Sequence, residues 1–463
     1  MTTKMVDLVI KGVKIFIEDS FFEGGVVVNE GKIVAIMEEK YLPEGKQKID
    51  GGGNYLIPGL IDTHVHFRDP ATPERETFET GTMAAAAGGT TTIFEGPVTI
   101  PPPYSAELIK QRIKIVKPKA IVDFAMEGAA GTKYLEHIKP CAESGIIYFK
   151  TFFHSTKDRA EEFDGMTMEN AGLQFRGFQE VSKTKKILAI HCEDEEMVQT
   201  FTKELVEKGK FDAEAHSLAR PPICEIEAVN KVLLFAKVTG LRIKFVHIST
   251  PESMELIKKA KSEGQEVYLE TCPHYLFLSN EDLIKYGPYA KINPPLRTKE
   301  SRDKLWDYIS DGTVDFIGTD HGPHLVSDKK KGFDNIFMAP SGFPSIETRC
   351  PLMLTAVKNG RLSYKRAIEL MSTNAAKIFG LYPKKGTIKI GSDADFVLVD
   401  MEKEFVVDNT KMFTKARDMA VVYNGFKLVG KPIMTIVRGK VVFEKGKIMP
   451  GVVGWGNFLK GII

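Results

Sequence analysis

The 463-residue chain has 43% hydrophobic and 27% charged residues, a composition typical of a globular protein. This length exceeds one ordinary domain and favours one large domain with a smaller one. The formal net charge is only +2, and no basic run is longer than the lysines at 329–331, so we expect no nucleic-acid partner. Since no apolar stretch reaches the roughly 18 residues that span a bilayer, we also expect no membrane partner.

The cysteines bear on the compartment. The chain has five, an odd number, and they are scattered without any Cys-x-x-Cys pair. This pattern predicts reduced thiols in a cytoplasmic protein, and it speaks against a disulfide framework or a structural zinc knot. The first ten residues carry both Lys4 and Asp7 and precede no long apolar region, so they lack the pattern of a signal peptide.

Both ends of the chain are predicted to be rich in short β-strands. The strand-like stretches are 8–10, 13–17, 25–28, 33–36, 396–399, 434–437 and 441–443. Asn29-Glu30-Gly31-Lys32 has the pattern of a hairpin turn. We expect both ends to build one small β-sandwich domain from residues 1–55 and 385–450, followed by a C-terminal tail at 451–463.

The middle of the chain, residues 56–384, alternates strand-like and helix-like segments. The expected strands are 60–66, 90–95, 120–125, 146–150, 187–191, 243–247, 267–270 and 316–320. Helical spacing of apolar residues is found at 106–116, 223–236, 253–261 and 300–309, with Glu225, Glu227 and Lys231 expected to face outward. Eight such units predict an α/β fold of the (β/α)8 TIM-barrel type, whose active site lies at the carboxyl ends of the strands. A doubly wound open sheet is the alternative.

The first expected barrel strand carries a possible pair of metal ligands. Because side chains alternate along a strand, Asp62, His64 and His66 share one face. Two imidazoles near a strand end can bind one metal ion. Two unrelated histidines give the same pattern, so this pair is a weak signal when taken alone.

Further polar residues close other expected strands. They are Lys150, His191, His247 and Asp320. In a barrel these side chains would converge on one rim. A core histidine with satisfied hydrogen bonds is the ordinary explanation for any one of them, but the convergence of all of them favours a metal site.

Lys150 follows Ile146-Ile-Tyr-Phe149 and precedes Thr151-Phe-Phe153, and apolar surroundings of this kind disfavour a charged amine. A neutral amine can react with carbon dioxide to give a carbamate that bridges two metal ions. A lysine that pairs with an acid or reaches water is the alternative, and burial alone favours this alternative over the carbamate.

Signature-like motifs run through nearly the whole chain in order. They are Pro58–His66, Phe149–Lys150, His191–Asp194, Val246–Thr250, Glu270–Tyr275, Gly318–His321 and Gly391–Phe396. Together they resemble the cyclic amidohydrolase family of dihydroorotases, hydantoinases and allantoinases. The resemblance implies that His64, His66 and Asp320 bind one divalent metal ion and that His191 and His247 bind a second. It also implies a carbamylated Lys150 between the ions and zinc as the usual metal. As a hypothesis, Asp320 is also the catalytic residue that carries the proton.

Some features point to dihydroorotase within the family. The His66-Phe-Arg-Asp-Pro70 segment resembles that enzyme, in which the arginine grips the substrate carboxylate. Segments 291–297 and 320–324 resemble it as well and add Asn293 and His324 as substrate contacts. An arginine fork suits a carboxylate better than a neutral ring edge. The alternative for Arg68 is a rim salt bridge with Asp69 or Glu74.

Other features point elsewhere. Val98 stands where dihydroorotases usually carry an asparagine, and segments 218–222 and 271–276 look more like allantoinase or hydantoinase. Against a hydantoinase, Ser155 stands where those enzymes place a tyrosine.

We therefore predict a dihydroorotase, which interconverts dihydroorotate and N-carbamoyl-aspartate in pyrimidine biosynthesis. A hydantoinase (dihydropyrimidinase) or allantoinase is the alternative, and a non-catalytic scaffold of the same fold is the competing class. We expect a small-molecule cyclic amide as partner and a homo-oligomer, either dimer or tetramer. The segment 325–341 is either a mobile loop over the site or a surface excursion.

Overall fold

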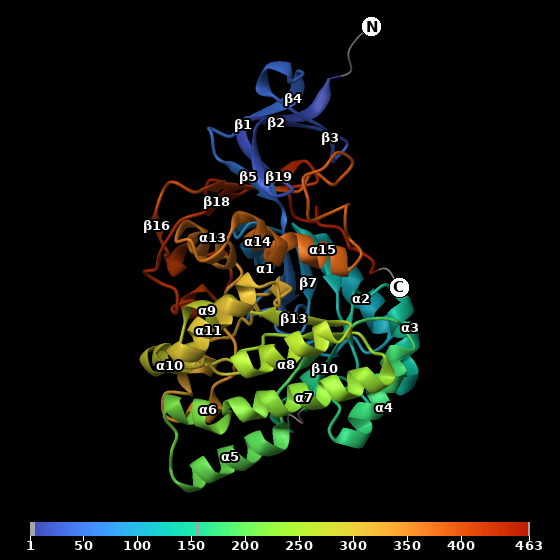
Figure 1. The fold of residues 1–463 in the computed structure, drawn as a ribbon, viewed down its shortest axis with the longest axis vertical. Coiled ribbons are helices and arrows are strands. Elements are labelled where there is room, and N and C mark those ends of the chain that lie inside the picture. The colour runs from blue at the N-terminus through green and yellow to red at the C-terminus, as the bar shows by residue number, and fades with distance from the viewer. Residues whose placement is uncertain (1–4, 154–156, 462–463) are drawn as a thin grey trace.

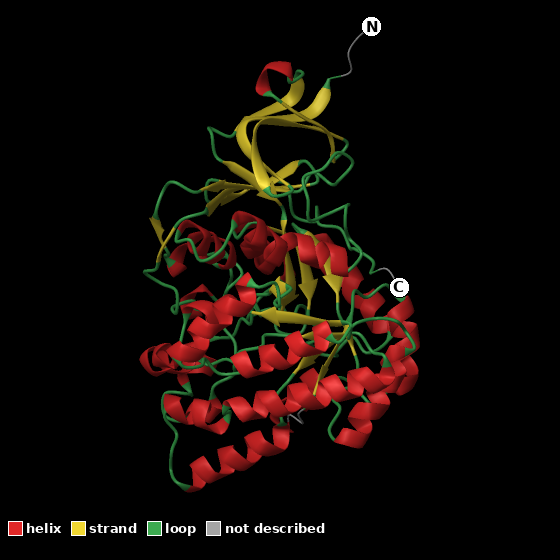
Figure 2. Cartoon of the chain, viewed as in Figure 1, coloured by secondary structure: helices red, strands yellow, loops and turns green. Residues whose placement is uncertain are grey.

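The structure is a computed structural model that describes residues 5–153 and 157–461. Helices surround a set of parallel strands, and a largely antiparallel sheet forms a lobe at one end (Figures 1 and 2). Within the described ranges, no helix is long and apolar enough to cross a membrane. Ser155, the position compared above with the hydantoinase tyrosine, lies outside the described residues.

The parallel strands follow one another in chain order. They are β6 (Leu60–Val65), β7 (Thr90–Glu95), β8 (Asp123–Met126), β9 (Gly128–Ala129), β10 (Phe149–Phe152), β11 (Leu188–His191), β12 (Ile243–Phe245), β13 (Val267–Thr271) and β14 (Phe316–Ile317). Strands β6 to β8 form one sheet and β9 to β14 another, and only Glu127 separates β8 from β9. A parallel bridge between Val65 and His321 links the last strand segment to the first. The pairings therefore run around a ring, which supports the predicted barrel.

Several strands are shorter than the sequence pattern indicates. The strand predicted at 243–247 ends at Phe245, and the one predicted at 316–320 ends at Ile317. The reason is that His247 and Asp320 have left-handed backbones, with φ of 42° and 47°. Such backbone outliers cluster at functional sites, where the surrounding structure compensates their strain.

Helices cover the outer side of the ring. They are α1 (Phe78–Ala87), α2 (Ala106–Val116), α3 (Ile138–Glu143), α4 (Ala171–Ser182), α5 (Glu195–Glu207), α6 (Ala213–Ala219), α7 (Pro222–Thr239), α8 (Pro251–Ser262), α9 (Pro273–Phe277), α10 (Asn280–Tyr286), α11 (Lys299–Ser310), α12 (Val326–Lys330), α13 (Arg349–Lys358), α14 (Tyr364–Ile368) and α15 (Asn374–Ile378). Side-chain caps fix several starts; Ser105, for example, accepts from the Leu108 amide at the start of α2.

The outward orientation predicted for Glu225 on α7 is wrong. The side chain is fully buried, and its carboxylate accepts hydrogen bonds from the backbone and hydroxyl groups of Ser249 and Thr250. This face of α7 lies against the loop that follows β12. A carboxylate is favourable there because it satisfies amides that would otherwise be buried without a partner.

Strands from both chain ends form one sheet. It contains β1 (Val6–Ile17), β2 (Ser20–Asn29), β3 (Lys32–Met37), β4 (Gly45–Asp50), β5 (Tyr55–Pro58), β15 (Phe396–Asp400), β18 (Lys431–Val437), β19 (Lys440–Glu444) and β20 (Lys447–Ile448). Its two halves meet where β5 pairs with β15. The predicted turn at 29–32 is present, since Asn29 pairs with Lys32 across β2 and β3.

Buried charges join this sheet to the parallel ring. Lys385 Nζ lies 2.7 Å from Asp123 of β8, 3.1 Å from Asp393 and 2.6 Å from Asp395. The lysine thereby compensates a group of carboxylates that has metal-like spacing. The segment predicted as a tail also contacts the ring, because the Leu459 amide donates to the Phe124 carbonyl of β8 at 2.7 Å.

Candidate active site

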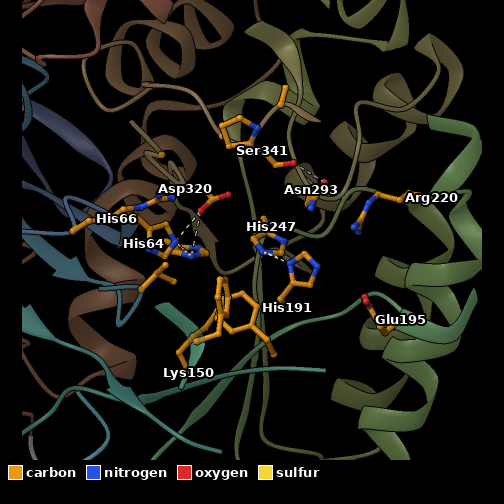
Figure 3. Close-up of a pocket in the computed structure, with 18 of the residues that line it drawn as sticks. His64, His66, Lys150, His191, Glu195, Arg220, His247, Asn293, Asp320 and Ser341 are labelled. Atoms are coloured by element: carbon orange, nitrogen blue, oxygen red, sulfur yellow. Dashed lines mark hydrogen bonds and ion pairs between the residues drawn. The ribbon is translucent and has the colours of Figure 1, made fainter. Parts of the chain in front are cut away.

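A cavity of about 570 Å³ lies at the carboxyl ends of the parallel strands. The predicted metal ligands all line it: His64, His66, Lys150, His191, His247 and Asp320 (Figure 3). They come from five different strand ends. The structure thus brings together residues that are as far apart in sequence as 64 and 320.

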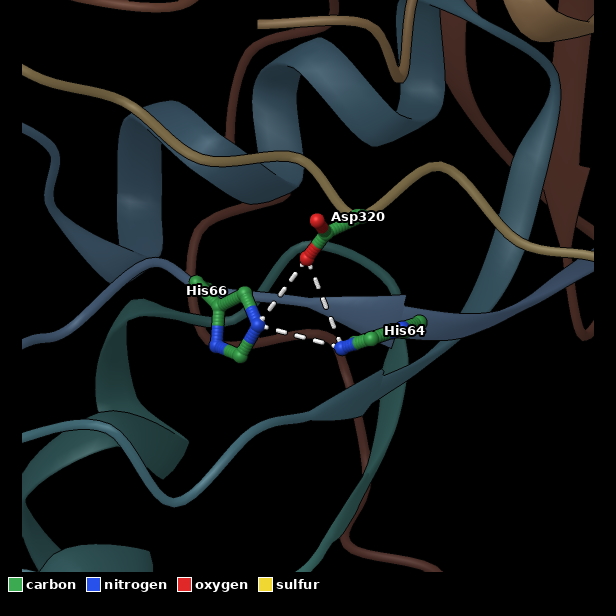
Figure 4. A group of neighbouring side chains, drawn as sticks. All are labelled: His64, His66 and Asp320. Carbon is green, nitrogen blue, oxygen red and sulfur yellow. Dashed lines mark hydrogen bonds and ion pairs between the residues drawn. The ribbon is translucent and has the colours of Figure 1, made fainter. Parts of the chain in front are cut away.

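One cluster combines His64, His66 and Asp320 (Figure 4). The two Nε2 atoms lie 3.1 Å apart, and Asp320 Oδ1 lies 3.4 Å from that of His64 and 3.1 Å from that of His66. The glycine after β7 makes room for this arrangement, because a Cβ atom at Gly96 would lie 2.5 Å from His66 Nδ1. Nitrogen and carboxylate donors in this spacing suit a divalent transition metal.

A second pair lies beside the first. His191 Nδ1 is 3.1 Å from His247 Nε2, and the rings of His64 and His247 stack with centroids 5.5 Å apart. Lys150 is buried, and its Nζ has no hydrogen-bond partner among the described residues. Buried polar groups normally have hydrogen-bond partners. The lack of one at Lys150 Nζ therefore fits an amine whose partners are supplied by a bound ligand.

The protonation states also suit metal binding. Burial lowers the pKa of His64, His66 and His247, which favours the neutral imidazole that ligates metals. Burial raises the pKa of Asp320, but His64, His66 and Lys150 outweigh it and hold the pKa well below its ordinary value. Burial lowers the pKa of Lys150 to about 8, so a neutral amine is accessible near neutral pH.

Each histidine group has a carboxylate partner that is not among the predicted site residues. Glu270 of β13 accepts from His64 Nδ1 at 2.8 Å, and Glu193 accepts from His191 Nε2 at 2.9 Å. Arg220 lies 2.5 Å from Glu193 and lines the cavity. Glu270 closes an expected strand, as the predicted ligands do, and that position was a usable signal.

The predicted substrate contacts divide into two groups. Arg68 and Asn293 line the cavity, and so does Val98, which takes the place of the expected asparagine. His324 is buried beside the cavity and does not line it; its Nε2 lies 2.9 Å from the Ser341 carbonyl oxygen. Of the two acids considered for a rim salt bridge, Asp69 binds Lys119 at 2.7 Å.

The segment 325–341 contributes part of the cavity wall. Phe337, Ala339, Pro340 and Ser341 line the cavity. Hydrogen bonds from Lys291 hold this segment, because Lys291 Nζ donates to the carbonyl oxygens of Ile336 and Ala339 at 2.8 and 2.6 Å. Ser341 also donates to Asn293 Oδ1 at 3.0 Å.

Comparisons with known proteins agree with this geometry. Residues 55–442 match the Amidohydrolase family. The chain is a cyclic amidohydrolase of this family. It is 35% identical to an L-hydantoinase of Paenarthrobacter aurescens over 457 residues, covering 98% of each chain. It is also 34% identical to an allantoinase of Bacillus velezensis, covering 98% of this chain and 97% of the relative, and 35% identical to a dihydroorotase of Methanothermobacter thermautotrophicus, covering 92% of each.

Solved structures give the same result. The L-hydantoinase (dihydropyrimidinase) from Arthrobacter aurescens superposes with a TM-score of 0.93 at 34% identity, covering 98% of this amidohydrolase and all of that chain. A D-hydantoinase superposes with a TM-score of 0.89 at 31% identity, covering 98% and 99%. Relatives with different named activities match almost equally well, so family membership fixes the reaction class and leaves the ring open.

Proposed function

We propose that this amidohydrolase hydrolyses the ring amide of a cyclic amide at a centre of two divalent metal ions, with zinc as the ion. The observation that carries the proposal is the convergence of the six predicted ligands on one cavity. His64, His66 and Asp320 would hold one ion, and His191 and His247 the other. Lys150, carbamylated on its buried amine, would lie between the two.

The chain's own residues account for the proton movements. When bound, two divalent cations lower the pKa of water and polarise the ring carbonyl. The Asp320 carboxylate is ionised because its pKa is held below the ordinary value, so it can accept a proton from the attacking water. As the carbon–nitrogen bond breaks, Asp320 returns that proton to the ring nitrogen. Water is thereby added across the bond, and the reverse sequence closes the ring.

Among the possible rings we propose dihydroorotate, because Arg68 lines the cavity. Its backbone is left-handed, with φ of 61°, and its amide donates to Glu95 Oε1 at 3.1 Å. Arg112 binds the same carboxylate at 2.6 Å. The Arg68 backbone is therefore held by a carboxylate that is itself fixed by an ion pair. A guanidinium in a low-dielectric cavity binds a carboxylate with paired, charge-assisted hydrogen bonds.

A hydantoin with an apolar substituent is the second candidate. Val98, Phe152 and Phe163 belong to one apolar cluster, and all three line the cavity. A wall of this kind would bury an aromatic or aliphatic substituent at about 25 cal/mol for each Å² removed from water. A dihydroorotate carboxylate gains nothing from it.

A substrate panel separates the two candidates. Purified protein loaded with Zn²⁺ is assayed with dihydroorotate, dihydrouracil, allantoin, hydantoin and 5-benzylhydantoin. We expect the highest kcat/KM for dihydroorotate, and we expect Arg68→Gln to lower that value by about 10- to 100-fold while changing the hydantoin rates little. A preference for 5-benzylhydantoin that Arg68→Gln leaves unchanged would establish the second candidate instead.

The organisation of the chain is part of the proposal. We propose that the ring of strands is a (β/α)8 barrel spanning residues 56–384. Residues 1–55 and 385–450 would form a β-sandwich domain, with 451–463 as a tail. We also propose a cytoplasmic homo-oligomer, either dimer or tetramer, whose mass light scattering would give.

A further inference from the structure

The interior of the ring is polar directly beneath His64. The interior of a parallel barrel is usually filled with branched apolar side chains. Here Glu270 of β13 and Lys244 of β12 lie side by side with no solvent exposure, 2.6 Å apart. Thr63 of β6 donates its hydroxyl to Glu270 Oε2 at 2.6 Å, and its carbonyl accepts from Lys244 at 2.8 Å.

This buried pair contacts the candidate metal ligands at one atom. Glu270 Oε1 lies 2.8 Å from His64 Nδ1. A carboxylate accepts hydrogen bonds, so this contact keeps the imidazole proton on Nδ1 and leaves the lone pair of Nε2 available. That Nε2 is the atom that faces His66 and Asp320.

We propose that Glu270, held by Lys244, is the positioning residue for the first metal position, where it fixes the tautomer and ring orientation of His64. This inference rests on the proposed two-metal function. A carboxylate bound to the second nitrogen of a metal-ligating histidine typically tightens metal binding by 10- to 100-fold. The space for the carboxylate is created by Gly318, since a Cβ atom there would lie 2.6 Å from the Glu270 carboxyl carbon.

The energetics favour positioning over stability as the role of the pair. Desolvation of two buried ions offsets most of their attraction, and apolar residues of similar volume are often equally stable in their place. A buried pair located directly under a ligand therefore indicates a function at that ligand.

The chain contains a matched control. Asp395 and Lys385 are also buried and also 2.6 Å apart, and Lys385 further contacts Asp123 of β8 and Asp393. Neither lines the cavity. Asp395→Asn thus removes a comparable buried charge without touching a candidate ligand.

The experiment titrates metal-free protein with Zn²⁺ against a chromophoric chelator, for wild type, Glu270→Gln and Asp395→Asn. Wild type should bind two ions. Glu270→Gln should bind one of them about 10- to 100-fold more weakly, and Asp395→Asn should bind both as wild type does. Unchanged binding in Glu270→Gln, or equal weakening in Asp395→Asn, would overturn the positioning role. A wild type that binds no Zn²⁺ would instead overturn the proposed function itself.

A second variant covers the case in which Glu270→Gln does not fold. Combining Glu270→Gln with Lys244→Met removes both charges together, so neither member of the pair is left buried without the other. We expect this double variant to fold and still to bind one Zn²⁺ about 10- to 100-fold more weakly, because the carboxylate at His64 is gone. Wild-type affinity for both ions in the double variant would contradict the inference.

Discussion

The two histidine groups of the cavity are supported in different ways. Behind His64, Glu270 and Lys244 are fully buried and do not line the cavity. Behind His191, Glu193 is bound by Arg220, and that arginine does line the cavity. Figure 3 shows Arg220 on the side of His191, across the cavity from His66.

This difference separates two kinds of support. Glu270 and Lys244 are buried inside the ring and cannot contact substrate, so they affect only what His64 binds. A support that includes Arg220 can respond to substrate as well, since a ligand in the cavity can contact the guanidinium that holds Glu193. Variants behind His64 should therefore change metal binding alone, whereas variants behind His191 should couple metal binding to substrate.

The largest effect is expected at Asp320. Asp320→Asn preserves shape but removes the carboxylate that carries the proton, so kcat should fall by about 10³-fold or more. The two histidines of this group remain, as does an amide oxygen at the position of the carboxylate, so we expect the Zn²⁺ content of protein loaded with excess Zn²⁺ to change little. The measurement is kcat together with metal analysis on the same preparation. Near-wild-type turnover would rule out Asp320 as the proton carrier.

The next effect is expected at Glu193. Arg220 and His191 outweigh burial and lower the pKa of Glu193 to about 2, so it is ionised at neutral pH. Glu193→Gln should lower the affinity for one of the two Zn²⁺ ions by about 10- to 100-fold. Zinc titration of the double variant, Glu193→Gln with Glu270→Gln, then tests the comparison. Because the two substitutions should weaken the binding of different ions, both ions should bind weakly in the double variant. If both substitutions weaken the binding of the same ion, the other ion keeps its wild-type affinity in the double variant, and the two carboxylates do not support separate metal positions.

A smaller effect is expected at Arg220. Arg220→Gln leaves Glu193 in place and removes only its ion-pair partner, so Zn²⁺ affinity should fall by no more than about tenfold. Because Arg220 lines the cavity, KM should rise in the same variant. Arg68→Gln is the matched comparison, since it should raise KM for dihydroorotate without changing Zn²⁺ affinity. An Arg220→Gln enzyme with altered KM and unaltered Zn²⁺ affinity would show that the arginine serves substrate alone.

The sequence predicted which polar residues line the cavity better than it predicted the residues behind them. His64, His191 and Asp320 stand at ends of apolar strands, where the architecture itself assigns a position to polar residues. Lys244 stands inside a strand. The left-handed backbone of His247 interrupts the alternation of side chains along the strand, so the direction of Lys244 could not be inferred from that of His247. Pattern alone could not show that Lys244 points inward to meet Glu270.

The substrate wall was the least predictable part. Phe163 and Phe337 reach the cavity from segments between regular strands. The segment that carries Phe337 is held by tertiary contacts such as the hydrogen bond from Lys291 to the Ile336 carbonyl. His324 follows Asp320 in a family-like motif, yet it does not line the cavity and lies next to Ser341. A motif fixes the order of residues along the chain, whereas the path of the intervening backbone decides which side chain faces the ligand.

The smallest effect concerns a histidine that serves neither group. Burial lowers the pKa of His274 to about 4 from its ordinary value of 6.5, and neither ring nitrogen has a hydrogen-bond partner among the described residues. The unfolded chain therefore binds more protons than the native state between these values, and stability should fall as the pH is lowered from 6.5 to 4, by up to about 1.4 kcal/mol per pH unit. His274→Phe, which keeps an aromatic ring near Tyr275 and Phe343, should remove this contribution. Urea unfolding of metal-free wild type and variant at several pH values gives the difference, and parallel pH profiles would show that His274 does not titrate as its burial predicts.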